Sequence, residues 1–386
     1  MKNFLFRTPE LNFGVGAVKG IGIKAKQLGA SRVLIVTDKG VVNAGILPRI
    51  EEPLREAGIE FEVYSDVEPE PNLDSLHEIV RIAKDGGFQF FIGVGGGSAM
   101  DVTKLASLMM TNSGEITDFL GVEKVPNQAA PTILVATTSG TGSEVTRFAL
   151  FGDNTIKRKT AVASPNIMAK AAFVDPELTV SMPGHVTAAT GIDAFIHAVE
   201  AYIAVNRNPA TDPLALEAIR LIAHNLVPAV KNGSNIEARY NMALGSVLAG
   251  MALNNAGAGA VHALAYPVAM EYHVSHGISN VVNFVHTMEY IAPALLDRYV
   301  NMAEVMGEKV SGLSQYEGAM TFVKVIRRLC IGATLPVGLK SIGVDSKIVP
   351  ALAETAFTDT RLLANTPYAL TTKDIITIYT NALMIS

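Results

Sequence analysis

The stretch from Gly191 to Tyr202, GIDAFIHAVEAY, carries three ionisable side chains in an otherwise apolar segment. In a helix, Asp193, His197 and Glu200 lie at positions i, i+4 and i+7, so they share one face. Apolar residues cover nearly every other face, which indicates a largely buried helix. Because an unpaired buried charge is strongly unfavourable, we expect a bound cation to be the partner of these side chains.

Two further histidines, His262 and His276, lie in an equally apolar stretch downstream. One aspartate with three histidines is a complete ligand set for Fe(II) or Zn(II). We therefore predict a metal site formed by Asp193, His197, His262 and His276. Glu200 is expected to support a ligand or to pack against a helix rather than to act as a fifth ligand.

The composition of the 386-residue chain predicts two domains around sizeable cores. Hydrophobic residues make up 49% of the chain and charged residues 17%, with a mean hydropathy of +0.30. The net charge of −5 and the pI near 5.9 argue against a nucleic-acid partner. The lone Cys330 excludes an internal disulfide, and no targeting segment is visible, so we expect a cytoplasmic protein.

The uncharged segment from Tyr240 to Met270 is long enough to span a bilayer. It contains Asn254, Asn255, His262 and a glycine-rich middle, however. Such polar groups suit buried helices that line a site better than helices that face lipid. We predict a core and no membrane partner.

Short β-rich runs alternate with helical patterns in the first half, which predicts a mostly parallel sheet with helices on both faces. The predicted strands are 33–38, 61–66, 88–97, 131–138 and 171–175, and the helical patterns include 46–57 and 73–84. Segments beginning at Phe148 and Thr160 predict an added hairpin. Helical periodicity dominates after Pro183, so we place the domains at 1–182 and 183–386.

Two loops rich in Gly, Ser and Thr follow predicted strands, at the sheet edge where open parallel sheets bind ligands. GGGSAMDVTK (Gly95 to Lys104) opens a helix, whose free N–H groups suit a pyrophosphate. A tight strand-to-helix turn is the alternative. TTSGTGSEVT (Thr137 to Thr146) is the second loop. Asp38 closes the first strand and either accepts from a ribose 2′-OH, favouring NAD over NADP, or forms a turn.

These motifs, together with DPELTVSMP, GAVHALAYP and HVSHGISN, resemble the iron-containing (group III) alcohol dehydrogenase family over essentially the whole chain. The resemblance implies a Rossmann-like, dinucleotide-binding α/β domain followed by an all-helical metal-binding domain, as in the dehydroquinate synthase-like fold. It carries metal ligation onto the same four residues. For NAD contacts it implies Asp38, Gly97, Ser98, Asp101, Thr137, Thr138, Thr141, Thr146 and Lys159.

One departure from the family pattern concerns the proton carrier. Members with small-alcohol activity often have a second histidine four residues after the third ligand, and this chain has Tyr266 there. Because the unperturbed pKa of tyrosine is about 10, Tyr266 is not an equivalent carrier and is expected to shape the pocket. We predict that His273 exchanges the proton, although it could instead cap a helix, and water at the metal is the alternative carrier.

The resemblance implies metal-assisted hydride transfer between a small primary alcohol or diol and nicotinamide, with a small alcohol or aldehyde as the only partner class. A hydroxyacid–oxoacid transhydrogenase with tightly held nicotinamide and a non-catalytic structural subunit are the alternatives. A sugar-phosphate cyclase or glycerol dehydrogenase matches the ligand pattern less well. We also expect a homodimer or a higher homo-oligomer. The sequence leaves the substrate and the choice of iron or zinc open.

Overall fold

The computed structural model describes residues 3–69, 71–153 and 158–384, without the side chains of residues 153, 158 and 159. The chain divides into two compact units. The N-terminal unit is Thr8–Met182. The C-terminal unit is Pro183–Ser386 together with Met1–Arg7, and the Arg7 backbone N–H donates to Asn255 Oδ1 at 2.8 Å within it.

The N-terminal unit is built on a six-stranded parallel sheet in the order β1-β9-β6-β4-β2-β3. The strands of this sheet are β1 (Glu10–Phe13), β2 (Arg32–Val36), β3 (Glu60–Tyr64), β4 (Phe91–Gly95), β6 (Thr132–Ala136) and β9 (Ala171–Val174). A smaller sheet has the order β5-β8-β7, with β5 (Gly121–Val122), β7 (Phe148–Asp153) and β8 (Arg158–Ala163). Its β7 and β8 pair antiparallel, which confirms the predicted hairpin.

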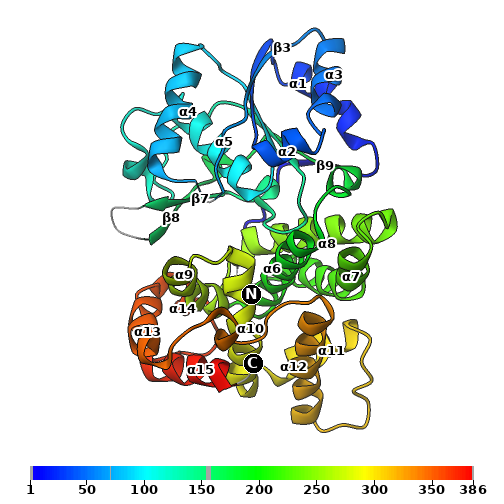
Figure 1. Cartoon of the computed structure of the whole chain (residues 1–386), viewed down its shortest axis with the longest axis vertical. Helices are drawn as coiled ribbons and strands as arrows, with labels where there is room; N and C mark the ends of the chain where they lie inside the picture. The colour runs from blue at the N-terminus through cyan, green and yellow to red at the C-terminus, as the bar shows by residue number, and fades with distance from the viewer. Residues whose placement is uncertain (1–2, 70, 154–157, 385–386) are drawn as a thin grey trace. The chain divides into compact units, whose positions relative to one another are not determined.

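Helices cover both faces of the six-stranded sheet because successive strand side chains point to opposite sides. Leu34 and Val36 of β2 belong to a core cluster with residues of α4 and α5, whereas Val33 and Ile35 belong to one with residues of α1 and α3. Figure 1 shows these four helices around the strands. The helices of this unit are α1 (Ile21–Gln27), α2 (Lys39–Asn43), α3 (Pro48–Glu56), α4 (Leu73–Asp85) and α5 (Gly97–Met109). The predicted parallel α/β architecture is confirmed.

The C-terminal unit is all-helical in its described residues, as predicted. Its helices are α6 (Gly184–Ile203), α7 (Thr211–Lys231), α8 (Ile236–Ala256), α9 (Ala260–Tyr272), α10 (His276–Ile291), α11 (Leu296–Val305), α12 (Gln315–Gly332), α13 (Val349–Phe357), α14 (Thr360–Ala364) and α15 (Thr372–Met384). They share one large apolar core, which includes Phe195, Phe284 and the fully buried Cys330. The Tyr379 hydroxyl of α15 donates to the Leu264 carbonyl of α9 at 2.7 Å.

Helix α7 is the one helix among the described residues that is long and apolar enough to cross a membrane, with a mean hydropathy of 1.2. It packs against α6 and α8, and core helices of soluble proteins pass the same length and composition test. The uncharged segment from Tyr240 to Met270 forms most of α8 and α9. Both helices contribute to the apolar core of the C-terminal unit.

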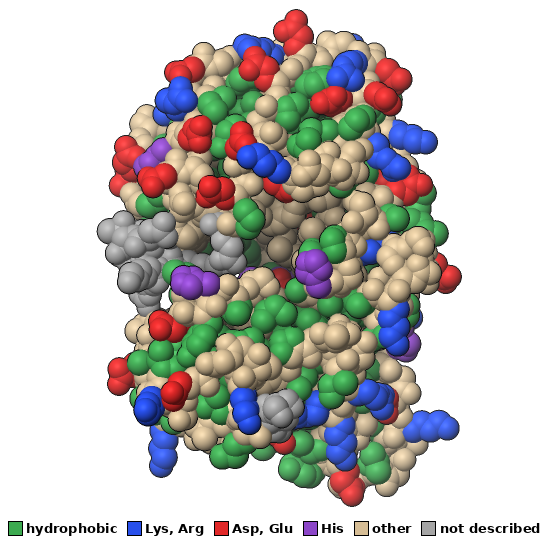
Figure 2. All heavy atoms as spheres, viewed as in Figure 1, with side chains coloured by type: hydrophobic (Ala, Val, Ile, Leu, Met, Phe, Trp, Pro, Cys, Tyr) green, Lys and Arg blue, Asp and Glu red, His purple; other side chains and the backbone are tan. Residues whose placement is uncertain are grey.

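The visible surface carries both signs of charge. Figure 2 shows Lys and Arg interspersed with Asp and Glu over the face of each unit that it displays. Exposed ion pairs of the chain include Lys39 with Asp66 and Arg220 with Glu217. A mixed surface of this kind agrees with the small net charge of −5.

Candidate functional site

Four predicted ligand residues converge in the C-terminal unit. One ligand atom from each of Asp193, His197, His262 and His276 lies within 4.8 Å of the other three. Asp193 and His197 stand one turn apart on α6, His262 lies in the first turn of α9, and His276 begins α10. Three of the residues are buried and His276 is half-buried. We call these four residues the quartet.

The distances within the quartet are those of side chains arranged around one ion. The Nε2 atoms of His262 and His276 lie 3.8 Å and 3.7 Å from Asp193 Oδ1, and His197 Nε2 lies 3.9 Å from Oδ2. Ligands that each stand 2.0–2.2 Å from a metal at tetrahedral angles lie about 3.3–3.6 Å apart. The three distances from Asp193 exceed that range by a few tenths of an ångström, whereas a separation of 4.8 Å must shrink by about 1 Å for the quartet to hold an ion.

Glu200 contacts the imidazole of His262 on the side away from the quartet. Glu200 Oε2 is 2.5 Å from His262 Nδ1, so Nδ1–H donates to the carboxylate. In the neutral imidazole, Nε2 then presents its lone pair toward an oxygen of Asp193. The Asn280 amide nitrogen lies 2.7 Å from Asp193 Oδ1 and 3.4 Å from His262 Nε2. A carboxylate oxygen and an imidazole lone pair that face each other in a buried site favour a bound cation, so these side chains fit a metal.

The electrostatics of the site favour an ionised Asp193. Burial alone would raise the pKa of this carboxyl, but the facing imidazoles and a hydrogen bond from Asn280 outweigh burial and hold the pKa at about 2. Burial favours neutral His262, yet the Glu200 carboxylate raises the pKa of that imidazole above its usual value. The anionic side chains thus attract positive charge to the quartet.

Tyr266 lies against two of the quartet imidazoles. Its ring stacks on His276 with a centroid separation of 5.8 Å and meets His262 edge-on at 6.4 Å. Burial raises the pKa of the Tyr266 hydroxyl far above its usual value. The hydroxyl therefore stays protonated at neutral pH, and the ring forms part of the wall around the quartet.

His273 occupies an unusual backbone position at the end of α9. It is exposed and caps the helix in the left-handed region, at φ 50° and ψ 37°. Left-handed residues commonly end helices, although glycine or asparagine is usual there. His273 therefore caps α9 with its backbone, which was the alternative to a role as proton carrier. A proton-carrying role for its side chain stays a prediction.

Asn280 is a site residue that the sequence analysis missed. It lies one turn after His276 on α10 and is fully buried. Its amide nitrogen donates to Asp193 Oδ1 at 2.7 Å and lies 3.2 Å from His276 Nε2. The only signal in the sequence is a polar side chain at i+4 from a ligand in an apolar helix.

The glycine loop of the N-terminal unit leads from β4 into α5. Gly95 has φ 154°, and a Cβ there would lie 2.7 Å from that of Ala99. A Cβ at Gly97 would lie 2.8 Å from Thr141, so the two predicted loops pack closely against each other. The N-cap residue of α5 is Gly96, which has no side chain to cap the helix. A helix N-terminus that begins in a close glycine turn fits a pyrophosphate.

Internal hydrogen bonds hold the second loop in shape. Thr141 Oγ1 accepts from the Ser143 backbone, and the Thr137 backbone donates to Gly95. Thr137 and Thr146 are buried, and Thr138 lies beside Gly96. Ser139, which the sequence analysis passed over, is buried with a hydroxyl that has no hydrogen-bond partner among the described residues.

Asp101 joins the two loops from inside. Its carboxylate accepts from Ser143 Oγ at 2.5 Å, from the Leu150 backbone at 3.0 Å and from Lys104 Nζ at 3.4 Å. Through these bonds Asp101 holds the start of α5 against the second loop and β7. A contact between Asp101 and the cofactor stays a prediction. Ser98 lies in the first turn of α5. The side chain of Lys159 lies outside the described residues.

Asp38 forms the turn that was one of the two alternatives for its sequence position. Its Oδ1 accepts from the Val41 backbone at 3.0 Å and caps α2, as a turn-forming aspartate would. Its Oδ2 lies 3.1 Å from the position of a Cβ on Gly95, next to the glycine loop. A contact between Asp38 and a ribose stays a prediction.

Comparisons with known proteins agree across the whole chain. The model of the iron-containing alcohol dehydrogenase family matches residues 8–176, and the C-terminal model of the Fe-containing alcohol dehydrogenase family matches residues 187–383. Long-chain-alcohol dehydrogenase 1 of Geobacillus thermodenitrificans is 42% identical, over 96% of this chain and 94% of that protein.

Two further relatives extend the comparison. The NAD-dependent methanol dehydrogenase of Bacillus methanolicus is 38% identical, over 99% of this chain and 100% of its own length. The crystal structure of a 1,3-propanediol oxidoreductase superposes with a TM-score of 0.96 at 36% identity, covering 99% of this chain and 100% of that one. The resemblance seen in the sequence is therefore confirmed: the chain belongs to the iron-containing alcohol dehydrogenase family and is an oxidoreductase enzyme.

Proposed function

We propose that this enzyme interconverts a small primary alcohol or diol and its aldehyde, with NAD as the hydride carrier and Fe(II) or Zn(II) as the metal. The observation that supports the proposal most strongly is the quartet, in which an ionised carboxylate faces three imidazoles within 4.8 Å. Relatives named for methanol, 1,3-propanediol and long-chain alcohols support an alcohol substrate.

Asp193, His197, His262 and His276 would hold the metal, which supplies Lewis-acid polarisation of the substrate oxygen when bound. Asn280 orients the Asp193 carboxylate by donating to it. Glu200 keeps the proton of His262 on Nδ1, away from the quartet. Tyr266 packs beside two ligands with its hydroxyl protonated, so it shapes the space next to them and moves no proton at neutral pH.

The N-terminal unit would hold the dinucleotide. Gly97 and Ser98 lie in the uncapped first turn of α5, where backbone N–H groups suit a pyrophosphate. Thr137, Thr138, Thr141 and Thr146 belong to the loop that packs against this turn. We also keep as proposals a cytoplasmic location, a homo-oligomeric state and domains at 1–182 and 183–386.

The test is metal analysis of purified protein together with an alcohol and aldehyde panel, assayed with NAD and with NADP. The proposal predicts one bound iron or zinc per chain and NAD-linked turnover of a small primary alcohol or diol. A nicotinamide that copurifies and exchanges too slowly to serve as a free substrate would support the transhydrogenase instead. Protein without iron or zinc that turns over no alcohol would refute the proposal.

A further inference from the structure

Glu200 makes two hydrogen bonds to neighbouring residues at the start of α9. Its Oε1 accepts from the Val261 backbone at 2.7 Å, and its Oε2 accepts from His262 Nδ1 at 2.5 Å. Glu200 is 2% exposed and lies on α6, two turns after Asp193. One carboxylate therefore ties the first turn of α9, including a proposed ligand, to the helix that carries two others.

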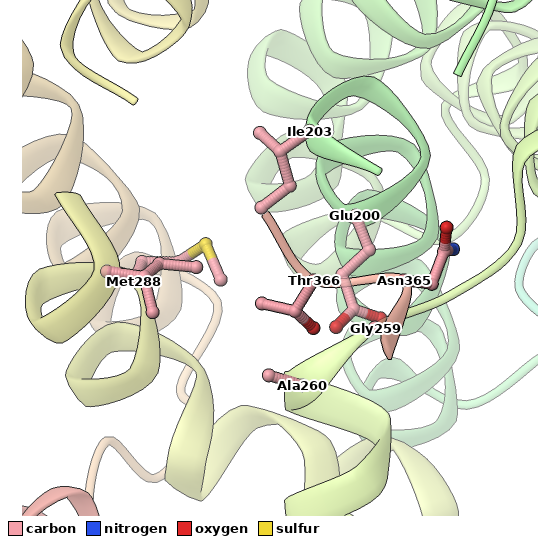
Figure 3. A pocket seen from close by; sticks show the side chains of 8 residues that line it. Glu200, Ile203, Gly259, Ala260, Met288, Asn365 and Thr366 are labelled. Atoms are coloured by element: carbon pink, nitrogen blue, oxygen red, sulfur yellow. The ribbon is translucent and has the colours of Figure 1, made fainter. Parts of the chain in front are cut away.

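The surroundings of Glu200 confine its carboxylate to this position. Figure 3 shows the side chain pointing toward Gly259 and Thr366. A Cβ on Gly259 would lie 3.0 Å from Thr366 Oγ1, a tight contact, and 3.4 Å from Glu200 Oε1, an ordinary van der Waals contact. The Gly259 backbone and the Thr366 hydroxyl therefore pack closely beside the carboxylate. The cavity beside it measures 10 Å³, about enough for one water molecule and too small for a substrate.

The hydrogen-bond pattern has a directional consequence for His262. A carboxylate accepts at both oxygens, so it accepts the Val261 N–H and the His262 Nδ1–H at the same time. With the proton held on Nδ1, Nε2 keeps its lone pair and faces Asp193 Oδ1 at 3.8 Å. A carboxylate that fixes the tautomer of a metal-binding histidine also raises its strength as a ligand.

We propose that Glu200 is a positioning residue of the metal centre, which holds His262 in the Nδ1–H tautomer and aims Nε2 into the quartet. The inference rests on the proposed function, because it takes the quartet as the metal site. Simple helix packing between α6 and α9 is the competing explanation, and it requires a side chain of this shape but no particular pattern of acceptors.

Glu200→Gln separates the two explanations because it keeps the shape and removes one acceptor. If the Gln oxygen accepts the Val261 N–H, its NH₂ group faces His262 Nδ1 and donates to it, which moves the ring proton to Nε2. If the amide is turned over, its NH₂ group opposes the Val261 N–H. Either arrangement weakens the site, whereas packing alone predicts little change.

The measurement is the affinity for Zn(II) by chelator competition, on wild-type protein, Glu200→Gln and the control Asp212→Asn. Asp212 is a half-buried carboxylate of the same unit, and its ion pairs are with Arg298 and Arg207 rather than with a quartet residue. We expect affinity to fall about 10–100-fold in Glu200→Gln, as for other partners of metal-bound histidines, and to be unchanged in Asp212→Asn. Equal affinity in Glu200→Gln and wild type overturns the inference.

Two further measurements keep the result interpretable. The first is the Zn(II) affinity of His262→Ala. If this variant binds Zn(II) as tightly as wild-type protein does, the quartet is not the metal site, and the proposed function is refuted together with the role of Glu200. If Glu200→Gln does not fold, ¹⁵N NMR of the histidines in Zn(II)-loaded wild-type protein shows which nitrogen of His262 keeps its proton, with His262→Ala to assign the signal. A proton on Nδ1 supports the inference, and a proton on Nε2 overturns it.

Discussion

The side-chain amide of Asn280 on α10 donates to Asp193 Oδ1 on α6 across 2.7 Å. The bond connects the only carboxylate of the quartet to the helix that carries His276. It lowers the pKa of Asp193 together with the facing imidazoles, against the opposing effect of burial. Asp193 is therefore oriented by a neighbour that is not expected to bind the metal.

Asn280→Ala should weaken metal binding about 10–100-fold, because Asp193 loses the donor that orients it. Asn283→Ala is the matched control, one turn further along α10, since the amide of Asn283 donates to the Ser279 carbonyl and touches no quartet residue. Chelator competition on both variants measures the effect. Equal losses in the two variants would mean that helix stability, and not the orientation of Asp193, controls affinity.

Removal of a ligand should have a larger effect than removal of a supporting residue. We expect His262→Ala and His276→Ala each to lower metal affinity more than about 100-fold, above the usual range for supporting partners, and to abolish turnover. Metal content after dialysis and alcohol oxidation with NAD measure the two effects. His286→Ala is the control, because His286 is a buried histidine that contacts the Val337 carbonyl and lies outside the quartet. Full metal occupancy and activity in either ligand variant would contradict the assignment.

Asp38 should make the enzyme prefer NAD, because its carboxylate repels a 2′-phosphate. Asp38→Gly should reduce the free-energy difference between turnover with NAD and with NADP by about 1–3 kcal/mol, the range for charge-assisted hydrogen bonds. The glycine variant also loses the cap of α2, at a cost of a few tenths of a kcal/mol or more. Asp38→Asn retains a capping oxygen while removing the charge, so the ratio of kcat/KM for NAD and NADP in both variants separates the two effects. A wild-type preference for NADP would refute the role of Asp38.

His273 and Tyr266 should respond differently to substitution. His273→Gln is expected to lower the rate and flatten its pH dependence, since an imidazole exchanges protons with water near neutral pH. Because burial raises the pKa of Tyr266, its hydroxyl carries no charge at working pH, and Tyr266→Phe should mainly alter substrate preference. His273→Asn serves as a second variant, because asparagine tolerates the left-handed backbone at this position. An unchanged pH–rate profile in both His273 variants would assign the proton to solvent.

Glu144 should make the N-terminal unit less stable as the pH rises through neutrality. Burial raises the pKa of this carboxyl to about 7 although Lys104 opposes the shift, so the folded state binds a proton that the unfolded state releases near pH 4.5. The free energy of unfolding is therefore highest below pH 4.5 and falls between pH 4.5 and 7, by roughly 3 kcal/mol if this group acts alone. Urea unfolding at pH 5 and pH 8 should show a smaller difference in Glu144→Gln than in wild type. Exposed Glu354→Gln is the control, and a wild-type difference retained in Glu144→Gln would contradict the assignment.

The part of the site that could be predicted from the sequence consists of ionisable side chains in apolar segments, where burial without a partner costs free energy. Asp193 and His197 stand one turn apart in an apolar helix, so the sequence alone indicated a buried charge and a partner for it. The parallel sheet was predictable for a similar reason, because runs such as Val33 to Val36 are apolar throughout. The four ligand assignments themselves remain predictions until metal binding is measured.

Other features depend on contacts that a linear pattern does not encode. β1 is short and of mixed polarity, and it exists because it pairs with β9 from the far end of the unit. In the sequence, Asn280 looks like any polar residue of a helix. Its role becomes visible only when the structure places α6, with Asp193, beside α10. The left-handed backbone of His273 follows from how α9 ends before α10 begins, and the sequence offered helix capping there only as one of two alternatives.

The hydrogen bond from Tyr379 to Leu264 links the metal centre to the order in which the helices are synthesised. The four quartet residues and Asn280 all leave the ribosome before α15 is synthesised. The helix that carries His262 nevertheless receives part of its anchoring from α15, the last helix in the chain. A nascent chain stalled after α12 would thus contain all four proposed ligands but lack α15, so we expect it to bind the metal weakly. Tight metal binding is therefore expected only after the last helix has been synthesised and packed.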